Sequence, residues 1–93
     1  MKFTEGSIAG VWLIDLEPRA DERGYFARTW CRDEFRRAGI DVEMVQASVS
    51  HNRAAGTLRG VHFQSPPFAQ DKLVRVVCGR ILDVAVDIRK GSP

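Results

Sequence analysis

The sequence predicts an all-β domain, either a sandwich or a barrel, with one short helix. Six extended segments rich in β-branched and aromatic residues follow one another along the chain. Turn-forming residues separate these segments at intervals of roughly 8–12 residues, as in many all-β folds. The last segment, residues 80–88, alternates apolar and polar side chains, which is typical of a strand with one buried face.

Two of the extended segments come before residue 31. Residues 10–16 (GVWLIDL) form the first, and Glu17 and Pro18 end it. Residues 19–24 are polar, and we expect them to form a turn. Residues 25–30 (YFARTW) form the second segment, which carries bulky side chains on both sides of the strand.

The one convincing helix covers residues 32–38. Its acidic residues stand in the early part and its arginines in the late part, an arrangement that suits the helix dipole. Gly39 follows directly, and glycine readily adopts the left-handed backbone that closes a helix. We therefore expect the helix to be about two turns long and to end at Gly39.

From residue 42 onward the chain is predicted to be nearly all strand. The extended runs cover residues 42–50, 57–64, 73–78 and 80–88. The breaks between them are residues 51–56, the corner at residues 65–68 with its two prolines, and the turn at Gly79. In the last run, one face is expected to be buried and carries Leu82, Val84, Val86 and Ile88.

The composition is that of one small globular domain and excludes several classes of protein. The chain has 93 residues, of which 44% are hydrophobic and 28% are charged. A net charge of +2, with acidic and basic residues interleaved, does not indicate a nucleic-acid binder. No segment approaches the roughly 20 apolar residues of a membrane span, and no signal peptide is visible. Cys31 and Cys78 lack metal or redox spacing, which favours a reducing cytoplasm.

The densest cluster of polar side chains lies in residues 57–64 (TLRGVHFQ) and is followed by Lys72. A strand with Arg59, His62 and Gln64 is poor core material and is better explained as the wall of a polar pocket. His62 suits a general base, because an imidazole can accept a proton near neutral pH. Lys72 and Arg59 could then hold an oxyanion. A half-buried structural histidine and solvated cations remain the alternatives.

The same residues argue against a metal centre. The position two residues after His62 is Gln64, so a His-x-His pair is missing. The other histidine, His51, lies in a predicted loop, and Lys72 is not an ordinary metal ligand. We therefore do not expect a metal centre at these residues.

Taken in order, these motifs resemble the family of dTDP-4-dehydrorhamnose 3,5-epimerases. The resemblance covers nearly the whole chain from about residue 8. The combination of an L-R-G-x-H-[FY]-Q motif with a K-L-V-R motif is specific. The matching blocks are DERGYF (21–26), FRRAGI (35–40), VQ (45–46), GTLRGVHFQ (56–64), Pro66 with Pro67, KLVR (72–75) and residues 79–93.

The resemblance implies a cupin-type jelly roll, usually dimeric, that acts on a dTDP-linked 4-keto-6-deoxy sugar without a cofactor. A proton would leave a carbon next to the C4 ketone and return on the opposite face. His62 matches the catalytic base, and Lys72 matches the lysine near the C4 oxygen. The positions that match contacts to the nucleotide sugar are Arg23, Phe26, Gln46 and Arg59.

The chief departure from the family is length, because the family's chain runs on for about as long again. That second half normally carries a tyrosine acid, the aspartate that orients the base and a further histidine. We therefore expect residues 1–93 to be the N-terminal part of a single cupin domain, with the C-terminal half absent. An alternative is a non-catalytic cupin remnant that binds a sugar nucleotide or a protein partner.

Overall fold

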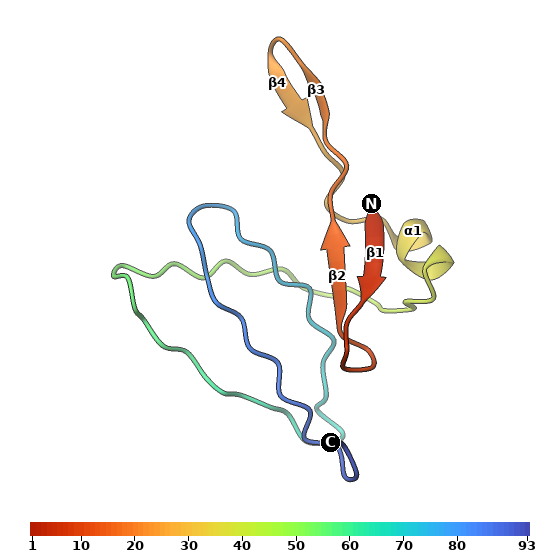
Figure 1. Cartoon of the computed structure of the whole chain (residues 1–93), viewed down its shortest axis with the longest axis vertical. Helices are drawn as coiled ribbons and strands as arrows, with labels where there is room; N and C mark the ends of the chain where they lie inside the picture. Colours follow the sequence, from red (N-terminus) through yellow and green to blue (C-terminus); the bar gives the residue numbers. More distant parts are fainter. The chain divides into compact units, whose positions relative to one another are not determined.

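The computed structural model describes all 93 residues, and its regular elements lie in the first 37 (Figure 1). They are β1 (Lys2–Glu5), β2 (Trp12–Asp15), β3 (Arg19–Asp21), β4 (Gly24–Phe26) and α1 (Arg32–Arg37). The strands form two small antiparallel sheets, so the predicted all-β class with one short helix is confirmed. The chain divides into an N-terminal unit, Met1–Val42 with Ile81–Pro93, and a central unit, Glu43–Arg80.

Strands β1 and β2 form a hairpin that the sequence predicted only in part. Strand β2 lies within the predicted segment 10–16, whereas β1 was not predicted. In the pairing, Phe3 lies opposite Ile14, and both side chains are partly buried. The connecting loop is closed by a hydrogen bond from the amide of Gly6 to the carbonyl of Val11 at 2.7 Å. Strand β1 has only four residues and no clear alternation, which explains why it was missed.

Strands β3 and β4 form a second hairpin, which corrects the prediction of a simple turn over residues 19–24. Arg19 pairs with Phe26, and Asp21 pairs with Gly24 across a loop of Glu22 and Arg23. The predicted strand over residues 25–30 is shortened, since β4 ends at Phe26. Asp21 accepts a hydrogen bond from the amide of Arg23 at 2.9 Å, a local turn contact of a kind that Asp side chains commonly make.

Helix α1 confirms the prediction for residues 32–38 almost to the residue. It ends with the full pair of C-terminal capping bonds: Gly39 donates to Arg36, and Ile40 donates to Phe35. Gly39 has φ +86°, the left-handed backbone that this motif requires. Cys31 stands at the N-cap without a side-chain capping bond. No helix is long and apolar enough to cross a bilayer.

The core of the N-terminal unit is a small aromatic cluster around α1. Phe35 is 2% exposed and is the one buried hydrophobic residue of the chain. The ring of Phe3 from β1 meets Phe35 edge-to-face, with centroids 5.0 Å apart. The ring of Trp30 also packs on Phe35, with the centroids 4.3 Å apart. Such pairs add about 0.5–1.5 kcal/mol beyond the burial of apolar area.

The four strands predicted after residue 42 are wrong for this structure, in which residues 38–93 contain no strand. The predicted breaks do appear: bends or turns lie at residues 53–56, 66–68 and 77–79. At the proline corner the amide of Phe68 donates to the carbonyl of Ser65 at 2.8 Å. A strand exists only when its backbone groups pair with a neighbour, and the local sequence does not specify that neighbour.

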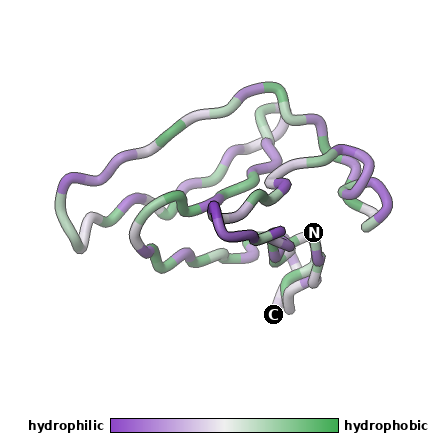
Figure 2. The backbone as a smooth tube through the Cα atoms, turned by 90° about the horizontal axis from the view of Figure 1, so that it is seen from above, coloured by the Kyte–Doolittle hydropathy of each residue, from purple (hydrophilic) through white to green (hydrophobic).

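The face predicted to be buried in residues 80–88 is also exposed, which is a second correction. Leu82 is 91% exposed, and Val84, Val86 and Ile88 are exposed as well. Apolar and polar residues largely alternate in residues 82–88, and hydrophobic and hydrophilic colours alternate along much of the backbone in Figure 2, but the apolar side chains of this segment stay exposed. The side chain of Asp87, on the face predicted to be polar, is instead largely buried by its ion pair with Arg89.

Candidate functional site

The six predicted site residues are divided between the two units. The N-terminal unit holds Arg23 and Phe26 on the β3–β4 hairpin. The central unit holds the other four, which are Gln46, Arg59, His62 and Lys72. We therefore describe each group within its own unit.

In the central unit, Arg59 is fixed across a tight turn. Its Nε donates to Oδ1 of Asn52 at 2.6 Å, and its Nη2 donates to the backbone carbonyl of His51 at 3.3 Å. The turn between these partners is closed by the hydroxyl of Thr57, which donates to the carbonyl of Ala54 at 2.8 Å. Gly56 supplies the left-handed backbone of the turn, with φ +78°. Asn52 was not predicted as a site residue, and its signal in the sequence is a polar amide near the start of the loop at residues 51–56.

The imidazole of His62 lies against the backbone of Gly60. A Cβ placed on Gly60 would approach Nδ1 of His62 to 3.3 Å, closer than ordinary van der Waals contact. The backbone of Gly60 has φ +107°, a conformation that residues with side chains rarely adopt. The glycine between Arg59 and Val61 therefore allows the imidazole of His62 to fold back over the chain. The side chain of His62 is exposed and open to an incoming molecule.

No hydrogen bond links the side chains of His62 and Lys72. Within Glu43–Arg80, the side chains that donate hydrogen bonds are those of Thr57 and Arg59. Lys72 and Gln46 are both exposed on segments without regular structure. Their roles as oxyanion holder and nucleotide contact therefore stay predictions.

On the β3–β4 hairpin, Arg23 forms a forked ion pair with Asp21. Its Nη2 lies 2.7 Å from Oδ2 of Asp21, and its Nε also donates to that carboxylate. The guanidinium lowers the pKa of Asp21, and the carboxylate raises the pKa of Arg23. Phe26 is 75% exposed at the other end of the hairpin, opposite Arg19. The hairpin thus presents an ion-paired guanidinium and an aromatic ring to solvent.

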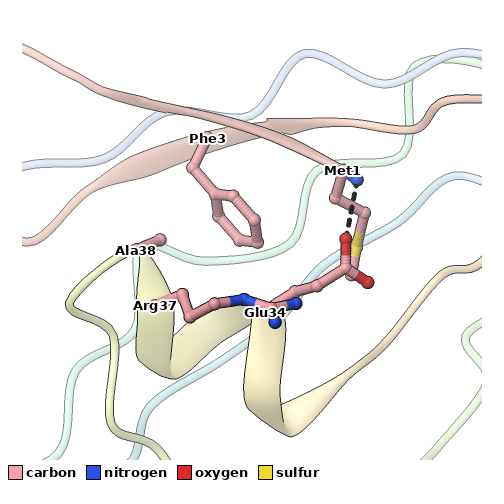
Figure 3. A pocket seen from close by; sticks show the side chains of 5 residues that line it. All are labelled: Met1, Phe3, Glu34, Arg37 and Ala38. Carbon is pink, nitrogen blue, oxygen red and sulfur yellow. Dashed lines mark hydrogen bonds and ion pairs between the residues drawn. The ribbon is translucent and has the colours of Figure 1, made fainter.

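The N-terminal unit also contains a shallow recess that the sequence did not predict (Figure 3). Its lining residues are Met1, Phe3, Glu34, Arg37 and Ala38. The amino group of Met1 lies 3.0 Å from Glu34 and 2.6 Å from Glu17. The Met1 ammonium, followed by Arg28, lowers the pKa of Glu34 to about 2. The Met1 ammonium and Glu34 thus neutralise each other, and Arg37 is the charged lining side chain that forms no ion pair.

No three His, Cys, Asp or Glu side chains gather closely enough to hold a metal ion. Each ion pair of the chain joins one carboxylate to an ammonium or a guanidinium group. The cofactor-free mechanism stays a prediction.

A comparison with known protein families matches residues 5–93 to dTDP-4-dehydrorhamnose 3,5-epimerase. The chain belongs to this family. The matched region contains all six predicted site residues. It excludes Met1 and Phe3, which line the recess, so the recess is only partly within the region that the family shares.

The relatives carry epimerase names and are about twice as long as this chain. A dTDP-4-dehydrorhamnose 3,5-epimerase of Sinorhizobium fredii is 48% identical over 93 residues, which cover 100% of this chain and 48% of the relative. The enzyme of that name from Methanothermobacter thermautotrophicus is 45% identical over 98% of this chain and 48% of its own. A dTDP-4-dehydrorhamnose 3-epimerase of Streptomyces niveus is 42% identical over 100% of this chain and 45% of its own.

This epimerase-family chain thus spans about half the length of the curated relatives it matches. No solved structure matches its fold. The family assignment therefore rests on the sequence. The cupin jelly roll stays a prediction, because no solved structure matches this chain.

Proposed function

We propose that residues 1–93 are the N-terminal part of a single cupin jelly-roll domain of a dTDP-4-dehydrorhamnose 3,5-epimerase, with the C-terminal half absent from this chain. The observation that carries the proposal is the family match over residues 5–93, which includes every predicted site residue. The proposed substrate is a dTDP-linked 4-keto-6-deoxy sugar. The proposed reaction is its cofactor-free epimerisation in dTDP-rhamnose biosynthesis.

In the proposed mechanism, His62 is the base. Its ring nitrogen accepts the proton from a carbon next to the C4 ketone, and the electron pair of that C–H bond moves to form an enolate. The ammonium of Lys72 stabilises the negative charge on the ketone oxygen. A proton donor on the opposite face of the sugar returns a proton to carbon and inverts the centre. The exposure of His62 and its position over Gly60 agree with a base that meets its substrate directly.

The nucleotide part of the substrate would contact the remaining predicted residues. Arginine suits a diphosphate because its planar fork binds oxygens in pairs. We propose that Arg23 and Arg59 have this role, that Phe26 stacks on an apolar part of the ligand, and that Gln46 hydrogen-bonds to it. The exposed ring of Phe26 and the fixed guanidinium of Arg59 support these roles.

A jelly roll that is completed by further chain and by a second copy would also explain the exposed apolar side chains. Val49 is 94% exposed and Leu58 is 89% exposed, although both lie in runs with strand propensity. We propose that these runs pair with strands of the C-terminal half and that the protein is a homodimer. The thiols of Cys31 and Cys78 suit the cytoplasm, the proposed location.

The test is solvent deuterium incorporation into dTDP-4-keto-6-deoxyglucose, followed by NMR at sugar C3 and C5, with the purified 93-residue chain. The wild-type chain is expected to exchange, and His62→Ala is expected to lower the rate by about 10²–10⁴-fold. Lys72→Ala is expected to lower it by about 10²–10³-fold. Lys90→Ala is the matched control, because it removes an exposed lysine outside the proposed site.

The position of the label decides the type of epimerase, since the relatives' names include both a 3,5- and a 3-epimerase. Label at C3 alone would indicate a 3-epimerase. Binding of the sugar nucleotide without exchange, unaffected by His62→Ala, would indicate the non-catalytic remnant. Absence of both exchange and binding would overturn the proposed activity for this chain.

A further inference from the structure

We infer that Asn52 is a positioning residue that holds the guanidinium of Arg59 in place for the diphosphate of the nucleotide sugar. The observation is the 2.6 Å hydrogen bond from Nε of Arg59 to Oδ1 of Asn52 across the turn at residues 53–56. The inference rests on the proposed function, because it assigns Arg59 a substrate contact. It goes further, because it names the residue that prepares this contact.

The two hydrogen bonds of Arg59 leave the outer edge of its guanidinium, formed by Nη1 and Nη2, free to bind a ligand. A guanidinium has five N–H donors. In Arg59 the Nε–H and one Nη2–H, which lie on one edge, are engaged by Asn52 and by the carbonyl of His51. The remaining donors lie on Nη1 and Nη2 and point away from that edge. Of these three donors, the two on the outer edge, one on Nη1 and one on Nη2, can bind two oxygens of a phosphate in parallel.

The turn itself is built to hold this arrangement. The Thr57 hydroxyl closes it with a 2.8 Å bond to Ala54, and Gly56 supplies the left-handed backbone. Asn52 and Arg59 flank this turn and are joined by their side chains. An exposed arginine has many rotamers, and restricting them before the ligand arrives reduces the entropy lost on binding.

Losing this restraint is expected to weaken the affinity for dTDP by a measurable factor. Ordering one flexible side chain on binding weakens affinity by about 3- to 10-fold. Asn52→Ala is therefore expected to weaken binding of dTDP by that factor. Asn52→Asp keeps an acceptor oxygen at the same place and is expected to retain the Nε contact.

The experiment combines two measurements on the 93-residue chain. Titration calorimetry with dTDP gives the affinity of the wild type, Asn52→Ala, Arg59→Ala and the double variant. The NMR signal of the Arg59 Nε–H reports the contact itself. Gln70→Ala is the matched control, because it removes an exposed amide of the central unit that does not contact Arg59.

The expected result is a coupled pair. Asn52→Ala weakens binding and shifts or broadens the Nε–H signal, Asn52→Asp restores that signal, and Gln70→Ala changes neither. In the Arg59→Ala background, Asn52→Ala is expected to have no further effect on dTDP affinity. If Asn52→Ala instead caused a general loss of structure, its effect would add to that of Arg59→Ala. This pattern would support the positioning role.

Two results would overturn the inference while leaving the proposed function intact. One is dTDP binding that Arg59→Ala weakens and Asn52→Ala does not. The other is an additive effect of Asn52→Ala in the Arg59→Ala background. Absence of dTDP binding by the wild type would overturn the substrate-binding proposal and the positioning role with it.

Discussion

The imidazole of His62 lies so close to Gly60 that a β-carbon on the glycine would be crowded. A Cβ on Gly60 would lie 3.3 Å from Nδ1 and 3.7 Å from Cε1 of the imidazole. The backbone at Gly60 also has φ +107°, where a β-carbon is strained. Local geometry thus explains why glycine suits this position of the L-R-G-x-H motif: without a side chain, it lets the proposed base lie over the main chain.

The first prediction is that Gly60→Ala displaces the ring of His62. The added methyl must push the imidazole away or the backbone must change, at a cost of about 1–2 kcal/mol for the left-handed conformation alone. The measurement is the NMR signals of the ring nitrogens, which can be assigned because the chain has only two histidines. We expect the His62 signals to move and those of His51 to stay.

Gly79→Ala is the matched control for this prediction. Gly79 has φ +86°, so the backbone penalty is similar, but nothing lies within 4 Å of its added Cβ. The control is expected to leave the His62 ring signals in place. Equal shifts in the two variants would show that the effect comes from backbone strain and not from the contact with the ring.

The second prediction concerns Phe35, which joins β1, α1 and Trp30 in one cluster. Phe35→Ala is expected to lower the free energy of unfolding of the N-terminal unit by about 3–5 kcal/mol, because it empties the centre of the core. A small domain has only about 5–15 kcal/mol in total, so this loss is large. Urea unfolding followed by tryptophan fluorescence measures it, since Trp30 touches Phe35.

Leu13→Ala is the control in the same unit. Leu13 is 63% exposed on the outer face of β2, and its truncation is expected to change stability by about 0.5 kcal/mol or less. Comparable losses for Leu13→Ala and Phe35→Ala would contradict the proposed core. They would indicate that the outer face of the sheet is covered in solution.

These local features show which parts of the structure the sequence can predict. Helix α1 was predicted closely, because its charges, its length and Gly39 all act within a few residues. Strand β2 and the turns near Gly56, Phe68 and Gly79 were predicted for the same reason. The helix and the turns depend on local backbone preference, and β2 pairs with β1, which lies only a few residues away in the sequence.

The strands after residue 42 could not be predicted in this way. Their β-branched residues and alternation describe a backbone suited to pairing, but the neighbouring strand must come from elsewhere. In this structure these runs pair with no other strand, and side chains such as Leu82 remain exposed. For the candidate site, the motif identified Arg59 and His62, but the contacts to Asn52 and Gly60 appear only in three dimensions.

The third prediction concerns the acid stability of the N-terminal unit and depends on Glu34. The Met1 ammonium and Arg28 lower its pKa from an ordinary 4.5 to about 2. A carboxylate with a lowered pKa stabilises the fold above its unfolded value and loses that effect as pH falls through the folded one. Between pH 4.5 and 2, the wild type is therefore expected to lose stability progressively.

Glu34→Gln is expected to remove this part of the pH dependence and to lower stability at pH 7. Acid titrations of the unfolding midpoint, monitored by tryptophan fluorescence, compare the two chains. Glu22→Gln is the control, because Glu22 lies in the exposed loop between β3 and β4. Parallel curves for the wild type and Glu34→Gln would show that the ion pair contributes nothing to acid stability.

The fourth prediction concerns Arg89, whose hydrogen bonds link the C-terminal segment of the N-terminal unit to the loop at Ala9. Its Nε and Nη2 donate to the carboxylate of Asp87 at 2.8 and 2.7 Å, and its Nη2 also donates to the carbonyl of Ala9 at 3.2 Å. This pairing holds the pKa of Asp87 well below its usual range. Residues 80 apart in the sequence are thereby joined.

Arg89→Lys keeps the charge but loses the planar fork, so one ammonium cannot reach both partners in the same geometry. We expect amide hydrogen exchange at Ser92, which donates to the carbonyl of residue 89, to accelerate by about 2- to 5-fold, the scale of an exposed ion pair. Arg32→Lys is the control, since it changes an exposed arginine at the start of α1. Unchanged exchange at Ser92 in Arg89→Lys would mean that charge alone fixes the segment, because lysine would then serve as well as the guanidinium.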